Sequence, residues 1–363
     1  MTFFLILGTR PQIIKSAPLI QEAKKQDLPI QIIHTGQHYD HSLSQIFFEE
    51  LSSPRPLANL NVGSGSHIFQ ITKIMSRLEK IFKSTKPSFV IVPGDTNSAL
   101  ASALASAKSN IPVVHLESGA RSFNIKMAEE LNRRLIDHCS EILFTPTINC
   151  KKNLEKESVP GKIYNVGDTM YDVFLTSQKK GDKSNILQKL NLSDKKYAIL
   201  TVHRAENVDN PIQLKKLFQT LNNAEIEIIF PIHPRTRERL QENNLLKKFD
   251  NIQTINPVGY LEMIKLLKHS KIVITDSGGL TKEAFWSKIP CVTLRNQIEW
   301  IETANMGVNI ITGMNPTKII QAMQYIQDNY QEIKQRFISN PFGNGQASKK
   351  IISILKKYYA SLQ

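Results

Sequence analysis

The chain has little cysteine, and this scarcity argues against two kinds of stabilising site. Cys139, Cys150 and Cys291 are its only cysteines, and they are too far apart in sequence to form a CxxC pair. Disulfide frameworks and structural zinc sites both use cysteines at close, regular spacing. We therefore expect no disulfide and no metal site. Reduced thiols of this kind are typical of a cytoplasmic protein.

No stretch of the sequence is apolar for long enough to span a membrane. The N-terminal segment MTFFLILGTR contains an apolar run, but no basic residue precedes the run and no small-residue cleavage site follows it. We expect this segment to form the first buried strand of a cytosolic protein that has no membrane partner.

Acidic residues are outnumbered, but the excess positive charge lacks the pattern of a nucleic-acid-binding protein. Lysine and arginine total 46 against 32 for aspartate and glutamate, which gives a formal net charge of +14. The lysines are scattered along the chain, and no basic segment is interleaved with aromatic residues that could stack on bases. We therefore expect no nucleic-acid partner. Such a charge suits the attraction of an anionic small molecule.

The sequence does contain a repeated alternation of short apolar strands and helices. At 363 residues, 41% of them hydrophobic, the chain is long enough for two domains with proper cores. In the first half, apolar runs predict strands at residues 2–7, 30–34, 88–92, 112–116 and 142–145. In the second half, they predict strands at residues 197–202, 226–230, 252–255, 272–275 and 291–294. This alternation predicts an α/β protein with two Rossmann-like, doubly wound domains facing a central cleft.

The domain crossover is expected in the polar stretch 151–184, which contains a Pro-Gly pair and a lysine-rich run. The predicted N-terminal α/β domain is residues 1–168, joined by a C-terminal helix at residues 345–363 that packs back on it. The predicted C-terminal α/β domain is residues 169–344. We find no internal repeat and no low-complexity tract.

The segment KIVITDSGGLTKE, residues 271–283, is the one around which the second domain is organised. Its β-branched run predicts a buried strand, and a helix is expected from Leu280, after the turn SGG at residues 277–279. Glycines at a strand-to-helix turn let a ligand approach the main chain, and the N-terminus of a helix attracts phosphate. We expect a diphosphate at this turn and a sugar diol on Glu283. The alternative is an ordinary tight turn.

Polar residues just past strand ends are the main candidates for chemistry, because ligands of doubly wound sheets bind at the carboxyl ends of the strands. In the first domain these residues are Arg10, His38, Asp95 and Glu117, and the helices that follow add Lys15 and Glu130. In the second domain the corresponding basic residues are His203, Arg204, His233, Arg235 and Arg295. Cations together with several carboxylates suit acid–base chemistry on a sugar attached to a diphosphate.

Several of these residues have a structural alternative. Asp95 could be the N-cap of the helix that follows it. Glu130 and Arg134 have the spacing of a surface i,i+4 ion pair. We interpret His115 and His138 as structural, and each histidine of the second domain could equally be a hydrogen-bonded rim residue.

Taken together, eight motifs resemble the non-hydrolysing UDP-N-acetylglucosamine 2-epimerase family. They are, in family order, GTRPQIIK from residue 8, GQH from 36, GDT from 94, HLESGAR from 115, EELNR from 129, VHRAEN from 202, TDSGG from 275 with Glu283, and NPFGNGQA from 340. Any one of them is a weak signal, but eight in register are specific. The resemblance implies a glycosyltransferase-B type of fold, a homodimer, and a reaction that uses no metal, nicotinamide or other cofactor.

The resemblance also implies the reaction. The family removes the proton at C2 of a UDP-2-acetamido sugar while UDP leaves C1, and UDP and the proton then return to the glycal intermediate with C2 inverted. UDP-GlcNAc thereby becomes UDP-ManNAc. The implied catalytic residues are Asp95, Glu117, Glu130 and His203, and which carboxylate acts on which face is left open. The residues expected to bind the UDP-sugar are Arg10, Lys15, Gln37, His38, Arg133, Arg204, His233, Ser277, Gly278, Gly279, Glu283 and Arg295.

The sequence departs from the family pattern in places that bear on its substrate. Gln12 stands where a glutamate is usual, and Ala128 stands where a proline is usual. Segments such as HTGQHYD, VGSGSH and TLRNQIEW resemble the branch that acts on UDP-2,3-diacetamido-2,3-dideoxyglucuronate, and we keep that 2-epimerase activity as the alternative. From other classes, a UDP-sugar glycosyltransferase of the same fold and a non-catalytic UDP-sugar sensor also remain, although neither needs three carboxylates.

Overall fold

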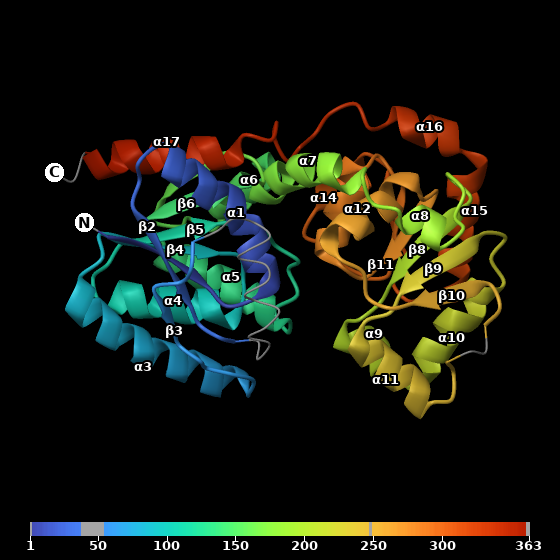
Figure 1. Ribbon diagram of the computed structural model, residues 1–363, viewed down its shortest axis with the longest axis horizontal. Coiled ribbons are helices and arrows are strands. Elements are labelled where there is room, and N and C mark those ends of the chain that lie inside the picture. The colour runs from blue at the N-terminus through green and yellow to red at the C-terminus, as the bar shows by residue number, and fades with distance from the viewer. Residues whose placement is uncertain (1, 38–53, 247–248, 361–363) are drawn as a thin grey trace. The chain divides into compact units, whose positions relative to one another are not determined.

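The structure, a computed structural model, describes residues 2–37, 54–246 and 249–360, which form two compact units (Figure 1). The first unit is Met1–Val173 with Pro341–Gln363, and the second is Phe174–Asn340. Each unit contains one parallel sheet with helices on both faces. This confirms the predicted α/β class with two doubly wound domains.

The first unit has a sheet in the order β3-β2-β1-β4-β5-β6-β7. Its strands are β1 (Phe3–Leu7), β2 (Ile30–His34), β3 (Ala58–Asn59), β4 (Phe89–Pro93), β5 (Val113–Leu116), β6 (Ile142–Thr145) and β7 (Lys162–Asn165). Its helices are α1 (Arg10–Lys25), α3 (His67–Thr85), α4 (Asn97–Lys108), α5 (Ala128–Cys139), α6 (Ile148–Lys156) and α17 (Ala347–Ala360), and α7 (Thr169–Gly181) spans the boundary between the units.

Successive side chains of β1 point to opposite faces of this sheet, because a strand is pleated. Phe4 packs into a buried apolar cluster with residues of α3 and α4. Phe3 points the other way, stacks on Phe89 of β4 and meets the ring of Tyr359 of α17 edge-on, at a centroid distance of 5.1 Å. The C-terminal helix therefore covers the face opposite to α3 and α4, where it lies against α1 (Figure 1).

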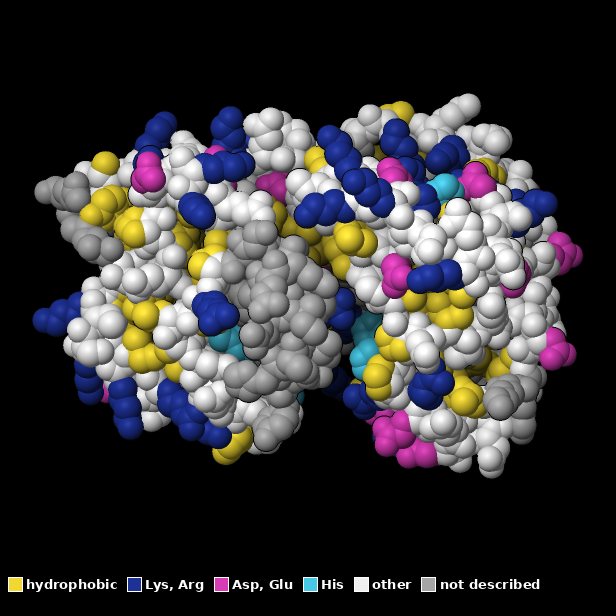
Figure 2. All heavy atoms as spheres, viewed as in Figure 1, with side chains coloured by type: hydrophobic (Ala, Val, Ile, Leu, Met, Phe, Trp, Pro, Cys, Tyr) yellow, Lys and Arg dark blue, Asp and Glu magenta, His cyan; other side chains and the backbone are white. Residues whose placement is uncertain are grey.

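The second unit has a sheet in the order β10-β9-β8-β11-β12-β13. Its strands are β8 (Tyr197–Thr201), β9 (Glu227–Pro231), β10 (Ile252–Ile255), β11 (Ile272–Thr275), β12 (Cys291–Thr293) and β13 (Asn309–Ile311). Its helices are α8 (Ile186–Lys189), α9 (Ala205–Val208), α10 (Pro211–Asn222), α11 (Pro234–Glu242), α12 (Tyr260–His269), α13 (Gly278–Trp286), α14 (Ile301–Asn305), α15 (Pro316–Asp328) and α16 (Tyr330–Gln335). Lys and Arg side chains gather over α7 and α8 on the face shown in Figure 2.

All ten predicted strands are present, and each end lies within one residue of its expected position. Three further strands, β3, β7 and β13, were not predicted. Each is at a sheet edge and has only two to four residues. β7 reads KIYN and is partly exposed. Short edge strands need no continuous apolar run, and the sequence of β7 therefore resembles the polar crossover around it.

Candidate functional site

In both sheets the strand order reverses at one point, and candidate residues lie there. In the first unit the reversal is between β1 and β4, which are followed by Arg10 and Asp95. In the second unit it is between β8 and β11, which are followed by His203 and Ser277. Doubly wound sheets bind ligands at such a switch point. Each unit therefore has one favoured ligand edge, and predicted site residues occupy it.

Asp95 lies in the turn after β4, where an arginine holds it. Arg133 of α5 approaches Asp95 Oδ2 with both Nε and Nη2, each at 2.8 Å. The Asp95 side chain is 31% exposed, so a ligand can reach it. The N-cap of α4 is Thr96, whose side chain accepts a hydrogen bond from Ala99 N at 3.2 Å. The N-cap alternative for Asp95 is therefore wrong.

Glu130 of α5 is fully buried and takes part in several hydrogen bonds. Its Oε2 accepts from Ser122 N at 2.8 Å and from Arg133 Nη1 at 3.1 Å, and Arg134 Nε lies 3.3 Å from Oε1. Burial favours the neutral acid, but the Ser122 N–H and the charges of Arg133 and Arg121 hold the pKa of Glu130 below its usual value. The surface-pair alternative is wrong, because the contact with Arg134 involves a carboxylate that solvent does not reach.

Glu117 follows β5 and has a backbone conformation that is unusual for a residue with a side chain. Its φ is 66°, and this left-handed conformation costs about 1–2 kcal/mol. Lys15 of α1 forms an ion pair with Glu117 Oε2. The turn carrying Asp95 lies beside the pair, since a Cβ on Gly94 would be 3.1 Å from Lys15 Nζ and 3.6 Å from Glu117 Oε2. The structure thus brings Asp95, Lys15 and Glu117 together.

The other candidates of the first unit follow β1 and β2. Arg10 is the first residue of α1 and is exposed. Gln37 uses Oε1 to accept hydrogen bonds from Ser98 N at 3.0 Å and from Ser98 Oγ at 2.6 Å. Gln37 is therefore fixed against α4. His38 lies outside the described residues.

Gln12, which replaces the usual glutamate, connects the two strands at the switch point. Its Oε1 accepts from Gly8 N at 2.8 Å, and its Nε2 donates to the Pro93 carbonyl oxygen at 2.7 Å. An ionised carboxylate has no hydrogen to donate to that carbonyl. The amide thus has a structural function here, which the sequence analysis did not foresee.

A buried charged network, which the sequence analysis did not predict, lies next to these turns. His115 of β5 places Nδ1 2.6 Å from Asp137 Oδ1 and Nε2 2.9 Å from the Gly94 carbonyl oxygen. Asp137 also accepts from Gly119 N at 3.2 Å and pairs with Arg121 Nη2 at 2.7 Å. Burial opposes ionisation, but His115 and Arg121 hold the pKa of Asp137 below its usual range. The network connects the turn after β4 with the loop after β5.

In the second unit, a buried carboxylate organises the turn after β8, and the sequence analysis overlooked it. Asp276, directly after β11, uses Oδ2 to accept from His203 N at 3.0 Å, Arg204 N at 2.9 Å and Asn207 Nδ2 at 3.1 Å. Its Oδ1 lies 3.2 Å from His203 Nδ1. Asp276 is fully buried, whereas the His203 side chain is 37% exposed. A signal was present, since this aspartate sits between a buried strand and the SGG turn.

The SGG turn forms the start of α13. Ser277 is its N-cap, and the Ser277 Oγ accepts from Leu280 N at 3.3 Å. The helix begins at Gly278, two residues before the predicted start. A Cβ on Gly279 would meet only Ser277 Oγ, at 3.8 Å, so the main chain is open there, whereas a Cβ on Gly278 would lie 3.4 Å from Glu299 Oε2 and 3.8 Å from Arg295 Nη1. The first N–H groups of a helix have no partner within it, so this turn can bind an anion.

Glu283 lies further along α13, and its side chain is almost completely buried, with 7% exposure. Burial raises the pKa of Glu283 to about 7, although the positive charge of Lys282 and the hydroxyl of Tyr260 act in the opposite direction. A carboxyl group with this pKa changes its protonation easily when a ligand adds or removes a hydrogen bond.

Arg295 and His233 have partners within the second unit. Arg295, after β12, forms a bidentate pair with the buried Glu299, with Nη1–Oε2 at 2.8 Å and Nη2–Oε1 at 3.0 Å. His233 is the N-cap of α11 and accepts from Arg235 N through Nδ1 at 3.2 Å. Its ring lies 5.5 Å from that of His203. Burial and the positive charges of His203 and Arg235 lower the pKa of His233.

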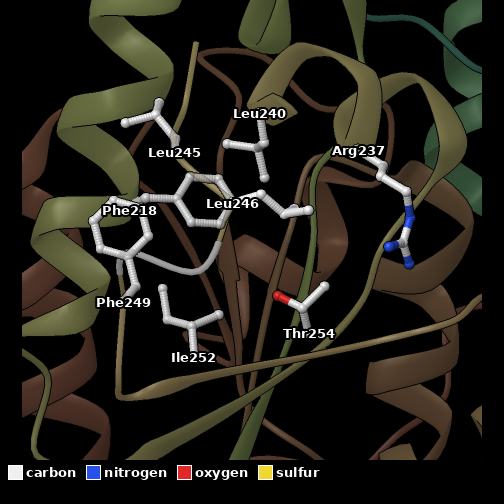
Figure 3. A pocket seen from close by; sticks show the side chains of 8 residues that line it. All are labelled: Phe218, Arg237, Leu240, Leu245, Leu246, Phe249, Ile252 and Thr254. Atoms are coloured by element: carbon white, nitrogen blue, oxygen red, sulfur yellow. The ribbon is translucent and has the colours of Figure 1, made fainter. Parts of the chain in front are cut away.

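An apolar cavity of about 280 Å³ lies elsewhere in the second unit, beside β10, α10 and α11 (Figure 3). Its lining residues are Phe218, Arg237, Leu240, Leu245, Leu246, Phe249, Ile252 and Thr254. None of these is a predicted site residue, and the cavity has one cation and no carboxylate. It is therefore no part of the candidate site.

The described residues contain neither of two other kinds of site. Within residues 2–37, 54–246 and 249–360, no group of three or more His, Cys, Asp or Glu side chains is placed to hold a metal ion. In the same part of the chain, no helix has the length and apolar character needed to cross a membrane.

Comparison with protein families gives a match over most of the chain. Residues 21–356 match the model of a family described as UDP-N-acetylglucosamine 2-epimerase. A UDP-N-acetylglucosamine 2-epimerase homolog from Methanococcus maripaludis is 47% identical, covering 98% of this chain and 99% of the relative. A UDP-2,3-diacetamido-2,3-dideoxy-D-glucuronate 2-epimerase from Pseudomonas aeruginosa is 40% identical, covering 98% of this chain and 100% of the relative.

Solved structures agree with this result. The UDP-GlcNAc 2-epimerase of Methanocaldococcus jannaschii, crystallised in complex with UDP-GlcNAc and UDP, has a TM-score of 0.90 and 44% identity, with 98% of this chain and 100% of that chain covered. UGT2 of Phytolacca americana, complexed with UDP-2fluoro-glucose and pterostilbene, has a TM-score of 0.62 at 10% identity, covering 98% of this chain and 99% of that chain, and so shares the fold alone. These similarities confirm the glycosyltransferase-B type of fold.

Proposed function

This chain belongs to the UDP-N-acetylglucosamine 2-epimerase family, and on that premise we propose that it converts UDP-GlcNAc to UDP-ManNAc by inverting C2. The proposal depends on one observation of the site. Asp95 and Glu117 follow neighbouring parallel strands, and each carboxylate lies beside a cation, Arg133 and Lys15 respectively. Inversion at carbon needs a proton carrier on each face of the sugar, and two adjacent carboxylates supply that number.

In the proposed reaction, one carboxylate takes the proton from C2. The electron pair of the C2–H bond forms the C1–C2 double bond, and the C1–O bond breaks with its pair leaving on UDP. UDP then adds back to C1 while the second carboxylate returns a proton to the other face of C2. The step is redox-neutral and needs no co-reactant.

We assign the two proton transfers to Asp95 and Glu117 and a supporting function to Glu130. Asp95 and Glu117 have exposed side-chain surface, at 31% and 17%, whereas Glu130 has none. Glu130 binds Arg133 and so holds this arginine against Asp95.

The departing diphosphate is the second group that needs stabilisation. Charge stabilisation in a preorganised site is commonly the largest catalytic contribution. Arg10, His203, Arg204 and the SGG turn offer cations and unpaired N–H groups at the switch points of the two sheets. We propose that the turn and His203 bind the diphosphate and that Glu283 accepts from the ribose.

The test is the fate of the hydrogen at C2. Incubation with UDP-GlcNAc in D2O should place deuterium at C2 of both recovered UDP-sugars, as measured by NMR. Glu117→Gln should lower the rate of incorporation, whereas the exposed control Glu238→Gln should match the parent protein. A transferase or a sensor would leave C2 unlabelled, and that result would rule out the proposed reaction.

The 2,3-diacetamido uronate is the alternative substrate, and one observation favours it. The Pseudomonas aeruginosa relative that carries this activity in its name is 40% identical over nearly the whole chain. Mass spectrometry of reactions with UDP-GlcNAc and with the uronate, combined with NMR of C2, decides between them. Turnover of the uronate at a much higher kcat/KM would replace UDP-GlcNAc as the assigned substrate.

We also propose that the protein is a homodimer that uses the outer face of α5. This helix buries polar residues, including Glu130 and Asp137, and exposes Leu131 by 47% and Leu135 by 40%. Exposed apolar faces commonly mark interfaces. Replacing both leucines with lysine should give a monomer in sedimentation velocity. A dimer that persists would place the interface elsewhere.

A cytoplasmic location is likewise a proposal. It rests on the small number of cysteines and their wide spacing in the sequence, which are typical of reduced thiols.

A further inference from the structure

We propose that Asp276 is a positioning residue that keeps a proton on Nδ1 of His203 and presents the Nε2 edge of the imidazole to the nucleotide. The inference rests on the proposed function, because it gives His203 a diphosphate to bind. It concerns a residue that is buried and that touches the ligand only through His203.

The hydrogen bonds of Asp276 described here are made with residues of one turn, the turn after β8. Its carboxylate accepts from the main-chain N–H groups of His203 and Arg204 and from Asn207 Nδ2, and its main-chain oxygen accepts from Arg204 Nε at 3.0 Å. Asn207 Nδ2 also lies 3.1 Å from the Leu294 carbonyl oxygen. Asp276 thereby fixes the turn after β8 against the ends of β11 and β12.

The N–H donors approach Oδ2 most closely, and Oδ1 lies beside the imidazole. Oδ1 is 3.2 Å from His203 Nδ1 and 3.2 Å from His203 N. A carboxylate oxygen can only accept, so the favoured form of the ring has its hydrogen on Nδ1. Nε2, on the opposite edge of a partly exposed side chain, is then the atom available to a ligand.

His233 provides an internal contrast. Its Nδ1 accepts from Arg235 N at 3.2 Å, so its hydrogen is on Nε2. The two rings are only 5.5 Å apart, at an interplanar angle of 31°. Neighbouring histidines are thus set to opposite tautomers by their own partners, a buried carboxylate for His203 and a backbone N–H for His233.

The proposed effect of Asp276 on function depends on the charge of the His203 imidazole. With Nδ1–H directed at the Asp276 carboxylate, a hydrogen on Nε2 as well makes the ring a cation, and this cation donates a charge-assisted hydrogen bond to the diphosphate that carries the electrons away from C1. Such bonds are roughly twice as strong as neutral ones. An amide at position 276 would turn its NH2 group toward Nδ1, so Nδ1 would become an acceptor and Nε2 would donate only as a neutral group.

The tautomer can be measured without any ligand. In 15N NMR of the protein labelled at histidine, Nδ1 of His203 should carry hydrogen in the parent protein, and Asp276→Asn should move the hydrogen to Nε2. Asn207→Ala is the matched control, because it removes a donor to the same carboxylate without touching the imidazole. The inference is overturned if Asp276→Asn leaves the His203 tautomer unchanged.

A double-mutant cycle then separates positioning from general support of the turn. Asp276→Asn alone should weaken UDP binding about tenfold and lower kcat more than it raises KM. On a His203→Ala background, the same substitution should change UDP affinity by less than about twofold. An equal loss on both backgrounds would mean that Asp276 only supports the turn, and the positioning inference would be withdrawn.

The two measurements also separate this inference from the proposed function. If the tautomer moves as expected but His203→Ala binds UDP and turns over like the parent protein, then Asp276 positions His203 but His203 does not serve the diphosphate. That outcome would refute the assignment of His203 in the reaction. A thermal midpoint within a few degrees of the parent value shows that each variant is folded, and Asp276→Glu, which keeps the charge, should retain the Nδ1–H tautomer.

Discussion

Replacing Glu283 with glutamine should stabilise the protein, and by more at pH 8 than at pH 5. Burial raises the pKa of this carboxyl group to about 7 in the folded protein, against an ordinary value of 4.5. The folded state therefore holds the proton more tightly than the unfolded chain does. As pH rises from about 4.5 to about 7 the folded state loses stability, and above about 7 the full cost is present.

The size of the effect follows from these two values. Each pH unit between them corresponds to about 1.4 kcal/mol, so the charged carboxylate costs the folded protein about 3 kcal/mol at pH 8. At pH 5 the cost is only about 1 kcal/mol, because most of the group is still protonated when folded. Glutamine removes the ionisation, and its own hydrogen bonding is the same at both pH values. The stabilisation should therefore be about 2 kcal/mol larger at pH 8 than at pH 5.

Urea unfolding followed by tryptophan fluorescence suits this measurement. Both tryptophans, Trp286 and Trp300, are buried in the second unit, which also contains Glu283. The exposed Glu238→Gln serves as the control and should change the free energy of unfolding by less than about 0.5 kcal/mol at either pH. An equal effect of Glu283→Gln at pH 5 and pH 8 would refute the raised pKa.

The raised pKa of Glu283 also predicts that UDP binding changes the protonation of this group. A ribose diol that donates to both oxygens of Glu283 favours the ionised carboxylate, so UDP binding near pH 6.5 should release up to about one proton. Calorimetry in buffers of different ionisation enthalpy measures this number directly. Proton release that is the same in the parent protein and in Glu283→Gln would remove Glu283 from the ribose site.

Three further predictions follow from the site. Asp95→Asn and Glu117→Gln should each lower kcat at least about 100-fold, while the Kd for UDP measured by calorimetry changes less than about threefold. If UDP affinity falls as much as kcat, these residues have a structural function. Arg10→Ala should weaken UDP binding about tenfold, and an unchanged Kd would exclude it from the diphosphate site. Asp137→Ala should lower the free energy of unfolding by about 3–5 kcal/mol, because it removes a fully buried carboxylate that contacts both His115 and Arg121. A loss below about 1 kcal/mol would show that the charged network contributes little.

The strands were predictable because each is a short apolar run bounded by polar turns, and burial on both faces of a parallel sheet demands such runs. The ligand edges were predictable for the same reason, since polar residues after strands converge in this topology. Asp276 also follows a strand, but that position does not distinguish a carboxylate that organises a turn from one that faces a ligand. Asp137 lies within a helix, and its importance depends on partners such as Arg121, whose approach only the folded chain reveals.

Helix α5 shows why local patterns can mislead. Its sequence, AEELNRRLIDHC, gives Glu130 and Arg134 the spacing of a surface pair, and its leucines would ordinarily face a core. In the structure the helix buries Glu130 and Asp137 and exposes Leu131 and Leu135. The polar face turns inward because it meets the strand-end turns that carry the candidate chemistry. A functional site can thus reverse the usual polarity of a helix.

The path of the chain between the two units has a consequence for biosynthesis. Residues 174–340 form one uninterrupted unit, whereas the other unit is completed only by residues 341–363. Ile351, Ile352 and Leu355 of α17 are buried there, and Asp172 accepts hydrogen bonds from the first residues of this helix. As the ribosome works from the N-terminus, the part of the protein that is translated first cannot finish folding until α17 has been translated. A nascent chain stopped shortly before α17 would contain a folded second unit and an incompletely folded first unit.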